Sequence, residues 1–504
     1  MLSDTGRTDS LWMVTSPPMV MPPLADDLHA DVCVIGAGIC GITTAYLLAR
    51  QGKRVIVLED GAVGGGETGR TTAHLASALD DRYHVLERLH GVEGARLAAA
   101  SHTAAIDRIE LIVREEGIAC DFERLDGYLF MPPGESPDLL AAELEAARRA
   151  GLVGVERVPR APLPSFDTGP CLRFPAQGQF HPLSYLHALV GAIERMGGRV
   201  FGQTHVTEVD PGPPARVSTD AGHTVTSGFV VCATNTPVID WLVIHSKQAA
   251  YRTFAIGARV PPGSVARALY WDTADPYHYV RLHGDVLIVG GEDHKTGQAD
   301  DGADRFARLE AWARERFPIG AVELRWSGQV MEPVDGLAYI GRNPGNKRHV
   351  FVATGDSGQG MTHGTIAGIL ICDLILGRPN EWERLYDPSR KSLRSAAEYV
   401  RENVNVARQY VDYVTPGEVG SESDIQPGEG AVVRHGLKKL AVYRDETGAV
   451  HRRSAVCPHL GCVVHWNSLE RTWDCPCHGS RFGIDGAVLN GPAITGLEAS
   501  STTS

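Results

Sequence analysis

The chain has 504 residues, of which 43% are hydrophobic and 22% are charged, a length and composition that predict two or three globular domains. Its formal net charge of −13 argues against nucleic acid or an anionic membrane surface as the main partner. The longest apolar stretch, residues 364–377, has 14 residues, fewer than the roughly 18 that a membrane span needs. The N-terminus lacks a basic region followed by an apolar one, so we expect no secretion signal, no membrane span and a cytoplasmic location.

Residues 30–60 have the pattern of a strand, a glycine-rich turn, a helix and a second strand. The turn reads Gly36-x-Gly38-x-x-Gly41, and Glu59 ends the second strand. In such a unit Gly36 makes the tight turn, Gly38 lets the backbone approach a pyrophosphate, and Gly41 lets the helix pack closely on the strand. The N–H groups at the helix start would bind the pyrophosphate, and Glu59 would accept a hydrogen bond from a ribose hydroxyl. A glycine-rich turn found alone is weak evidence, because many such turns bind no ligand. The complete unit of strand, turn, helix, strand and acid predicts a dinucleotide site.

Two later stretches, residues 64–77 and 350–377, favour FAD over NAD. Together with residues 331–344 they resemble the D-amino-acid oxidase superfamily of flavoproteins. This superfamily includes glycine and sarcosine oxidases, and the resemblance covers roughly residues 31–387. It implies that the first stretch passes along the flavin and that the second lies under the isoalloxazine and the ribityl chain. The residues that it places at FAD are Thr71, Thr72, His74, Val206, Gly358, Gly360, Met361 and Thr362.

The same resemblance implies a substrate domain, a mixed sheet over the flavin, at about residues 166–329. Tyr279 and Arg281 stand where the family often has substrate-facing side chains, although Arg281 could equally be a solvated edge-strand arginine. His181 is either a flavin-site histidine or a loop histidine. With His74 these are the catalytic candidates, and the sequence does not choose among them. No cysteine stands where sarcosine-type oxidases tether the flavin, so we expect non-covalent FAD.

Four of the ten cysteines lie close together near the C-terminus. Cys457-x-His459 is followed by Cys475-x-x-His478, and Cys462 and Cys477 remain, one near each pair. A zinc ion with two cysteines and two histidines is one interpretation. The other is an iron–sulfur cluster in which two cysteines bind one iron and two histidines bind the other. The six scattered cysteines lie mostly in apolar runs and are predicted to be inert core thiols.

Residues 425–497 closely resemble the Rieske [2Fe–2S] domain. The resemblance implies that Cys457 and Cys475 bind the inner iron, that His459 and His478 bind the outer iron, and that Cys462 and Cys477 form a disulfide. It also implies a hydrogen bond from Ser480 to a bridging sulfide and a proline loop at residues 490–493 that covers the cluster. The subgroup has a tyrosine hydroxyl as a second donor, and this chain has Phe482 at that position, so that donor is absent. We therefore expect a reduction potential above that of plant-type ferredoxins and below that of the respiratory-complex proteins.

These predictions define a fold class. It is an α/β FAD-binding domain of the Rossmann, D-amino-acid oxidase-like type, with a mixed-sheet α+β substrate domain and a small all-β Rieske domain. The predicted ranges are an N-terminal extension (1–30), the FAD-dependent oxidoreductase domain (31–387), a helical segment and linker (388–424) and the Rieske domain (425–504).

The arrangement resembles bacterial FAD-dependent oxidoreductases with a C-terminal Rieske domain, and the resemblance implies a function. An amine or amino acid would lose a hydride to the flavin, and electrons would then pass one at a time through the cluster to an external acceptor protein. Two alternatives stay open: a flavin reductase supplied with electrons by a ferredoxin through the Rieske domain, and a redox sensor. No second glycine-rich nucleotide unit follows Glu59 before Val350, which weakens the interpretation as a pyridine-nucleotide reductase.

Overall fold

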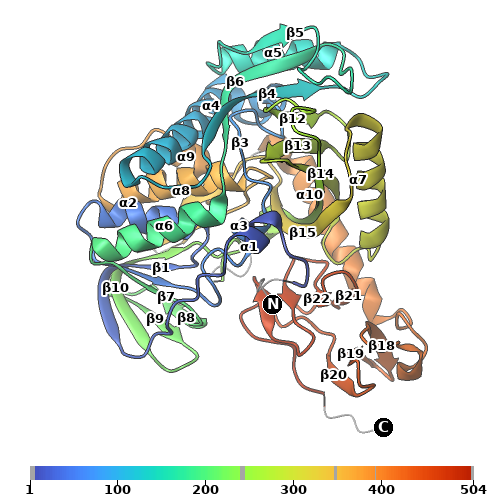
Figure 1. The fold of residues 1–504 in the computed structure, drawn as a ribbon. Coiled ribbons are helices and arrows are strands. Elements are labelled where there is room, and N and C mark those ends of the chain that lie inside the picture. The colour runs from blue at the N-terminus through green and yellow to red at the C-terminus, as the bar shows by residue number, and fades with distance from the viewer. Residues whose placement is uncertain (1–5, 239–243, 346–348, 392, 501–504) are drawn as a thin grey trace.

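The computed structural model describes residues 6–238, 244–345, 349–391 and 393–500. Residues 1–5 and 501–504, the outer ends of two predicted domain ranges, lie outside the described residues. Two large sheets with their helices form the body of the molecule, and the C-terminal strands form a smaller unit beside it (Figure 1). No helix in the described ranges is both long and apolar enough to cross a membrane.

The first sheet has eight strands, and the βαβ unit predicted from the sequence lies at its centre. β1 pairs in parallel with β2 on one side and with β10 on the other, and β10 pairs in parallel with β17. All four residues of β2 are buried, as expected for a parallel strand covered on both faces. The strands are β1 (Leu28–Ile35), β2 (Val55–Leu58), β7 (Arg199–Phe201), β8 (Val206–Asp210), β9 (Ala215–Thr219), β10 (Thr224–Cys232), β16 (Tyr339–Arg342) and β17 (Val350–Thr354).

Helices α2 (Ile39–Ala49), α6 (Pro182–Arg195) and α8 (Gly360–Ile375) lie together over one face of this sheet (Figure 1). α8 packs closely on α2 because Gly364 and Gly368 have no side chains. A Cβ on Gly364 would lie 3.1 Å from the backbone nitrogen of Cys40, and one on Gly368 would lie 3.2 Å from the backbone carbon of Thr43. The long helix α4 (Tyr83–Glu116) is kinked at Gly91 and packs against α5 (Asp138–Arg149) and α8. This close packing holds the N-termini of α2 and α8 near one another.

The second sheet has nine strands and is mixed, since β4 and β12 pair in parallel while the other neighbours are antiparallel. Helix α7 (Gly302–Arg316) packs on β11 and β14. The predicted substrate range, 166–329, contains strands of both sheets, because the chain returns to the first sheet at β7 to β10. The strands are β3 (His74–Leu75), β4 (Glu123–Phe130), β5 (Glu156–Val158), β6 (Cys171–Gln179), β11 (Gln248–Arg259), β12 (Leu269–Asp272), β13 (His278–His283), β14 (Val286–Lys295) and β15 (Val322–Pro333).

The C-terminal unit consists of two small antiparallel sheets of three and four strands. Helix α10 (Ala396–Gln409) connects it to the body of the molecule, after the short helix α9 (Glu383–Tyr386) (Figure 1). Short 3-10 turns lie at His245–Lys247, Leu393–Ser395, Tyr410–Tyr413 and Glu422–Asp424. The strands are β18 (Gly430–His435), β19 (Lys438–Arg444), β20 (Val450–Ser454), β21 (His465–Asn467), β22 (Thr472–Asp474), β23 (Arg481–Phe482) and β24 (Val488–Asn490).

The N-terminal residues are part of the main core. Helix α1 (Leu11–Thr15) begins at Ser10, whose hydroxyl accepts a hydrogen bond from the Met13 N–H. The Trp12 side chain is fully buried, and its indole N–H donates to the carbonyl of Thr71 over 2.6 Å. α1 and α3 (Glu67–Arg70) therefore hold the segment that the sequence predicts to pass along the flavin.

Candidate active site and cluster site

A cavity of about 1270 Å³ lies between the two sheets, beyond the carboxyl ends of the central parallel strands. Gly36, Glu59 and Ala233, each the first residue after one of these strands, line it. Ligands of open α/β sheets bind at this edge. Residues of the C-terminal unit, including Glu470 and Asn490, line the same cavity.

The first glycine-rich turn has the geometry of a phosphate-binding loop. Gly36 has a φ of 102°, and a Cβ on it would lie 2.5 Å from the carbonyl oxygen of Ala233. A Cβ on Gly41 would lie 1.9 Å from the Gly36 carbonyl oxygen, so only glycine fits there. The N–H of Ile39, at the start of α2, donates to the Thr68 hydroxyl over 3.1 Å. This helix N-terminus faces the cavity and fits the pyrophosphate of a dinucleotide.

Most of the residues predicted to contact FAD line this cavity. Glu59 is held in place because its carboxylate accepts hydrogen bonds from the N–H groups of Ala37 and Gly61. Gly41 and Thr362 do not line the cavity: Gly41 lies in the packing of α2, and the Thr362 hydroxyl contacts His102 Nδ1 at 2.8 Å. The predicted residues that line it are Gly36, Gly38, Glu59, Thr71, Thr72, His74, Val206, Gly358, Gly360 and Met361.

The second glycine-rich turn brings acidic and tyrosine side chains to the cavity. Gly358 has a φ of 70°, and a Cβ on it would lie 2.4 Å from Asp80 Oδ2. The Tyr277 hydroxyl donates to the same oxygen over 3.0 Å. Asp80 and Tyr277 were not predicted from the sequence. Asp80 is a single polar residue after the segment 64–77, and Tyr277 lies within the predicted strand region 276–297 with no pattern that indicates its contact with Asp80.

Two of the four catalytic candidates, His74 and Tyr279, line the cavity. His74 Nδ1 lies 3.0 Å from the Thr72 hydroxyl oxygen, and burial lowers the His74 pKa to about 3. His74 is therefore a neutral imidazole at physiological pH. The Tyr279 hydroxyl lies 2.6 Å from the Thr253 hydroxyl, and Gly290 leaves room for the Tyr279 ring, which a Cβ would approach to 2.1 Å.

The other two candidates, His181 and Arg281, do not line the cavity. The Arg281 guanidinium is buried and donates to the carbonyls of Thr72, Ala73 and Phe180, at 3.1, 2.6 and 3.3 Å. It also lies 5.1 Å from the centre of the Trp12 ring.

His181 accepts a hydrogen bond from the Ser184 N–H at the start of α6. The Arg281 and His181 side chains both support the backbone behind the cavity wall.

The four predicted cluster ligands lie on two loops that meet in the C-terminal unit. Cys457 and Cys475 are each 1% exposed, and their thiols form a hydrogen bond that lowers the pKa of Cys457. Backbone N–H groups of His459 and Leu460 also point to the Cys457 sulfur, and those of Cys477 and His478 point to the Cys475 sulfur. Such donors stabilise thiolates that bind iron.

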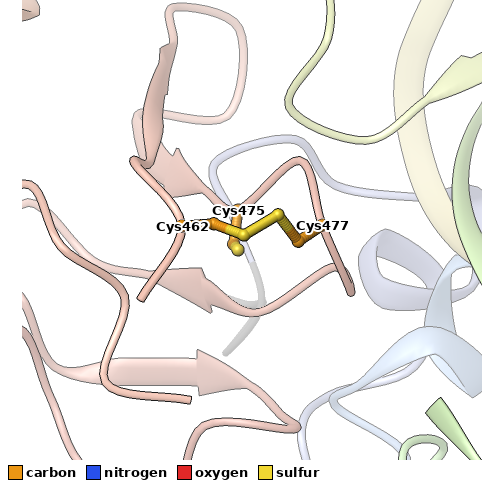
Figure 2. Close-up of side chains that lie close together, drawn as sticks. All are labelled: Cys462, Cys475 and Cys477. Carbon is orange, nitrogen blue, oxygen red and sulfur yellow. A yellow bond between two sulfur atoms is a disulfide. The ribbon is translucent and has the colours of Figure 1, made fainter. Parts of the chain in front are cut away.

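The remaining pair of cysteines forms a disulfide between the two loops. Cys462 and Cys477 are bonded, with their Cα atoms 6.4 Å apart. Figure 2 shows the Cys475 sulfur next to this disulfide, and all three sulfur atoms lie within 4.8 Å of one another. The Ser480 hydroxyl accepts a hydrogen bond from the Ala493 N–H over 3.0 Å, which attaches the proline loop to the cluster loop.

The two predicted histidine ligands face the body of the molecule. His459 and His478 are 8% and 6% exposed, and their ring centres are 5.0 Å apart. His245 lies edge-on to both, 5.1 and 6.3 Å away. Nδ1 of His478 is buried without a hydrogen-bond partner in the described part of the chain. Burial of imidazoles and thiols in one place fits a mixed histidine and cysteine metal site.

The loop that carries His478 contacts the cavity wall directly. The Gln329 side chain lines the cavity and donates a hydrogen bond from Nε2 to the Gly479 carbonyl over 3.0 Å. Glu67, which also lines the cavity, accepts from the Gln329 N–H and from Asn490 Nδ2. The cluster loop and the proline loop therefore close one side of the cavity.

A buried ion-pair network strengthens this contact. Glu470 and Arg70 form a pair at 3.1 Å, and neither side chain is exposed. Burial acts to raise the pKa of Glu470, but Arg70, Arg252 and Arg481 outweigh it and lower the pKa to about 2. The Glu470 carboxylate also accepts hydrogen bonds from Thr8, so the N-terminal segment takes part in the same network. A buried carboxylate with these partners ties the two parts of the molecule together.

Residues 31–374 match the family described as FAD dependent oxidoreductase, and residues 415–500 match the Rieske [2Fe-2S] domain. The chain belongs to the FAD-dependent oxidoreductase family. It is 33% identical to the Rieske 2Fe-2S iron-sulfur protein YhfW of Bacillus subtilis (strain 168) over 498 residues, 97% of both chains. It is 27% identical to the gamma-glutamylputrescine oxidoreductase of Escherichia coli (strain K12), over 70% of this chain and 85% of that protein. The fold is similar to that of glycine oxidase from Geobacillus kaustophilus, with a TM-score of 0.61, 17% identity and coverage of 72% of this chain and 99% of that one.

These matches confirm the predicted fold class, the oxidoreductase class and the two cofactors. The flavoprotein domain implies FAD and the C-terminal domain implies a [2Fe–2S] cluster, which excludes the zinc interpretation. The cavity and the cluster loops described above fit these groups. The individual ligand and contact residues stay predictions, as does non-covalent attachment of the FAD.

Proposed function

We propose that the protein oxidises the C–N bond of a small amine or amino acid and that the electrons leave one at a time through the Rieske domain to an external acceptor protein. One contact supports this proposal above all. Gln329 belongs to the wall of the FAD cavity and is hydrogen-bonded to Gly479, the residue after His478. A plain oxidase has no use for such a connection, because it passes its electrons to oxygen at the flavin.

The residues proposed to hold the cofactors are those whose geometry fits them. Gly36, Gly38 and the N-terminus of α2 would hold the pyrophosphate of FAD, and Glu59 would bind a ribose hydroxyl. Cys457 and Cys475 would bind the inner iron of the cluster, with His459 and His478 on the outer iron. When bound, FAD supplies a two-electron hydride acceptor and the cluster supplies a one-electron carrier.

The protein side chains then have positioning roles. The substrate must lose its amine proton before its C–H bond breaks, because the nitrogen lone pair forms the C=N bond of the iminium product. Both ring nitrogens of His74 have partners in the protein, the Thr72 hydroxyl at Nδ1 and the Val280 carbonyl at Nε2, so His74 shapes the cavity wall beside that amine. Arg281 and Trp12 fix the carbonyls of Ala73, Thr72 and Thr71 and thereby hold the neighbouring His74 in place. A ferredoxin as the acceptor and a cytoplasmic location are further parts of the proposal.

The proposal can be tested by rapid mixing of the oxygen-free holoenzyme with amines and amino acids. We expect the flavin absorbance to bleach first and the cluster absorbance to bleach after it. Reduction of the flavin by reduced ferredoxin, with no response to any amine or amino acid, would show that electrons run in the opposite direction. If electrons pass between the flavin and the cluster in neither direction, the result would support the interpretation as a redox sensor.

A further inference from the structure

Three acidic side chains line one part of the cavity. We define the substrate end of the cavity as Asp80, Thr253, Tyr277, Tyr279, Asp293 and Glu332, which line it together. Three of these six residues are carboxylic acids, and the other three supply hydroxyl groups. Such a surface favours a positively charged ligand, provided that protein cations do not already neutralise it.

The cations that line the cavity gather elsewhere. Among the described lining residues, the lysines and arginines are Arg7, Arg70 and Arg471. Arg70 is paired with Glu470, and Arg471 adjoins Glu470 in the chain and donates to Glu446. Arg7 follows Gly6, whose Cβ position is 2.3 Å from Glu470 Oε2. All three therefore lie around Glu470, at the contact with the Rieske domain, and none belongs to the substrate end.

Arg281, the arginine predicted to face the substrate, is buried behind the cavity wall and does not line the cavity. Its Nε and Nη2 have no hydrogen-bond partner among the described residues. Its Nη1 donates to three backbone carbonyls, those of Thr72, Ala73 and Phe180, and it is 1% exposed. An α-amino acid brings a carboxylate that needs a cation or several hydrogen-bond donors when it is buried. The substrate end as described offers no guanidinium or ammonium group for it.

A local irregularity in β14 brings Asp293 to the cavity. The pairing of β14 with β11 shifts register opposite Thr253, and Glu292 has a φ of 62°. A bulge of this kind redirects a side chain that the regular alternation would place otherwise. Asp293 Oδ1 is shielded from solvent and has no hydrogen-bond partner in the described part of the chain. Asp293 nevertheless lines the cavity, so its carboxylate is available to a ligand on that side.

The protonation behaviour of these acids agrees with this picture. Burial raises the pKa of Asp293 to about 7 and also raises the pKa of Asp80. At Asp293 burial outweighs the Thr253 hydrogen bond and the attraction of Arg305, and at Asp80 it outweighs the attraction of Arg82. An ammonium group bound beside Asp293 would reverse this rise, because the charged carboxylate would gain a partner.

We propose that the substrate is a diamine or polyamine, in which one amine is oxidised and a second, protonated amine is bound by Asp293, with Asp80 beside it. This inference rests on the proposed function, since it names the substrate class of the same site. The reaction is then the loss of a hydride from the carbon next to the first nitrogen to FAD, with formation of an iminium. The second ammonium group keeps its proton throughout and serves for recognition.

The test uses binding to the holoenzyme that dithionite has fully reduced, so that no amine can be oxidised during the measurement. Calorimetry would compare 1,4-diaminobutane with 1-aminobutane and 4-aminobutanoate, which have the same chain length. We expect 1,4-diaminobutane to bind about 10-fold more tightly than either, the order expected for one additional charge-assisted hydrogen bond. Tighter binding of 4-aminobutanoate than of the diamine would overturn the proposal.

Two variants make the test specific to Asp293. Asp293→Asn keeps the size of the side chain and removes its charge, so the preference for 1,4-diaminobutane over 1-aminobutane should fall about 10-fold. Glu292→Gln is the matched control, since Glu292 is the neighbouring acid and pairs with Arg308 away from the cavity. An unchanged preference in Asp293→Asn, with FAD fully bound, would refute the role of Asp293.

The outcomes also separate this inference from the proposed function. If amino acids reduce the flavin of the oxidised enzyme and diamines do not, the proposed function stands and the substrate class is wrong. If no amine or amino acid reduces the flavin at all, the proposed function itself fails.

Discussion

The Gln329 side chain donates a hydrogen bond to the Gly479 carbonyl across the boundary between the flavoprotein domain and the Rieske domain, over 3.0 Å. The Thr296 hydroxyl holds Gln329 from the other side. A Cβ on Gly479 would lie 2.4 Å from the Ala250 side chain, so the glycine allows the cluster loop to approach the sheet this closely. The proposed electron carrier thus rests on the wall of the cavity proposed for the electron source.

Gln329→Leu should slow electron transfer from the flavin to the cluster, because the change removes the hydrogen bond and keeps the side-chain volume. A loss of about 10-fold is expected if the contact fixes the distance, since the loss of a buried hydrogen bond costs about 1–3 kcal/mol. Rapid-mixing spectroscopy would measure this rate beside the rate of flavin reduction, which should change little. Gln298→Leu is the control, because Gln298 bonds the carbonyl of Pro476 on the same loop and does not line the cavity. Equal rates in both variants and the wild type would show that the contact has no part in the transfer.

Protonation of Glu470 at low pH should weaken the contact between the flavoprotein domain and the Rieske domain. Its pKa falls from the ordinary 4.5 to about 2 in the folded protein, so the stabilisation is complete above pH 4.5 and is lost as the pH falls toward 2. Glu470→Gln should weaken the contact already at pH 7, by about 3 kcal/mol, because Arg70 and Arg252 then lose their buried partner. Small-angle scattering and limited proteolysis of the linker would detect the separation. Glu446→Gln, at an exposed pair with Arg471, should have almost no effect.

Gly41→Ala should abolish FAD binding. The new Cβ would lie 1.9 Å from the Gly36 carbonyl oxygen, so the phosphate-binding turn and the start of α2 must move apart. The absorbance of the purified variant near 450 nm is dominated by flavin and would measure the bound FAD after correction for the cluster. Gly191→Ala in α6 is the control, because the nearest atom to its Cβ is the flexible end of Arg195, and alanine favours the helix by about 0.5–1 kcal/mol. Full FAD content in Gly41→Ala would show that this turn does not bind the cofactor.

The sequence predicted the parts of the site that depend on local patterns. The turn at Gly36 is a short motif whose spacing indicates its geometry, and the roles of the Cys457 and Cys475 loops were predicted from their resemblance to the Rieske domain. The position of Asp293 could not be predicted in this way, because it depends on a bulge opposite Thr253, a residue 40 positions earlier in the chain. Long-range pairing decides such positions, and a single sequence does not reveal it.

The position of the Arg281 side chain also depends on long-range contacts that a single sequence does not reveal. The alternating pattern of residues 276–297 correctly predicted strands, and it left Arg281 on either face. The outcome depends on Trp12, more than 260 residues earlier, which lies against the guanidinium, and on three carbonyls from two other segments. Buried arginines need such partners, and only the folded chain brings them together.

The disulfide between Cys462 and Cys477 should protect the cluster without being needed for its assembly. It joins the two loops over a separation of 15 residues, and removal of such a link destabilises a domain by about 3 kcal/mol. The variant with both Cys462→Ser and Cys477→Ser should therefore bind a [2Fe–2S] cluster, since all four predicted ligands remain, and should lose it several-fold faster in air or with a chelator. Decay of the cluster absorbance, with electron paramagnetic resonance of the reduced cluster, would measure the lifetime. Cys372→Ser, a buried thiol on α8, controls for the loss of a core cysteine. Complete failure to assemble the cluster would mean that one of the two cysteines is a ligand, and an unchanged lifetime would mean that the disulfide does not form in the protein.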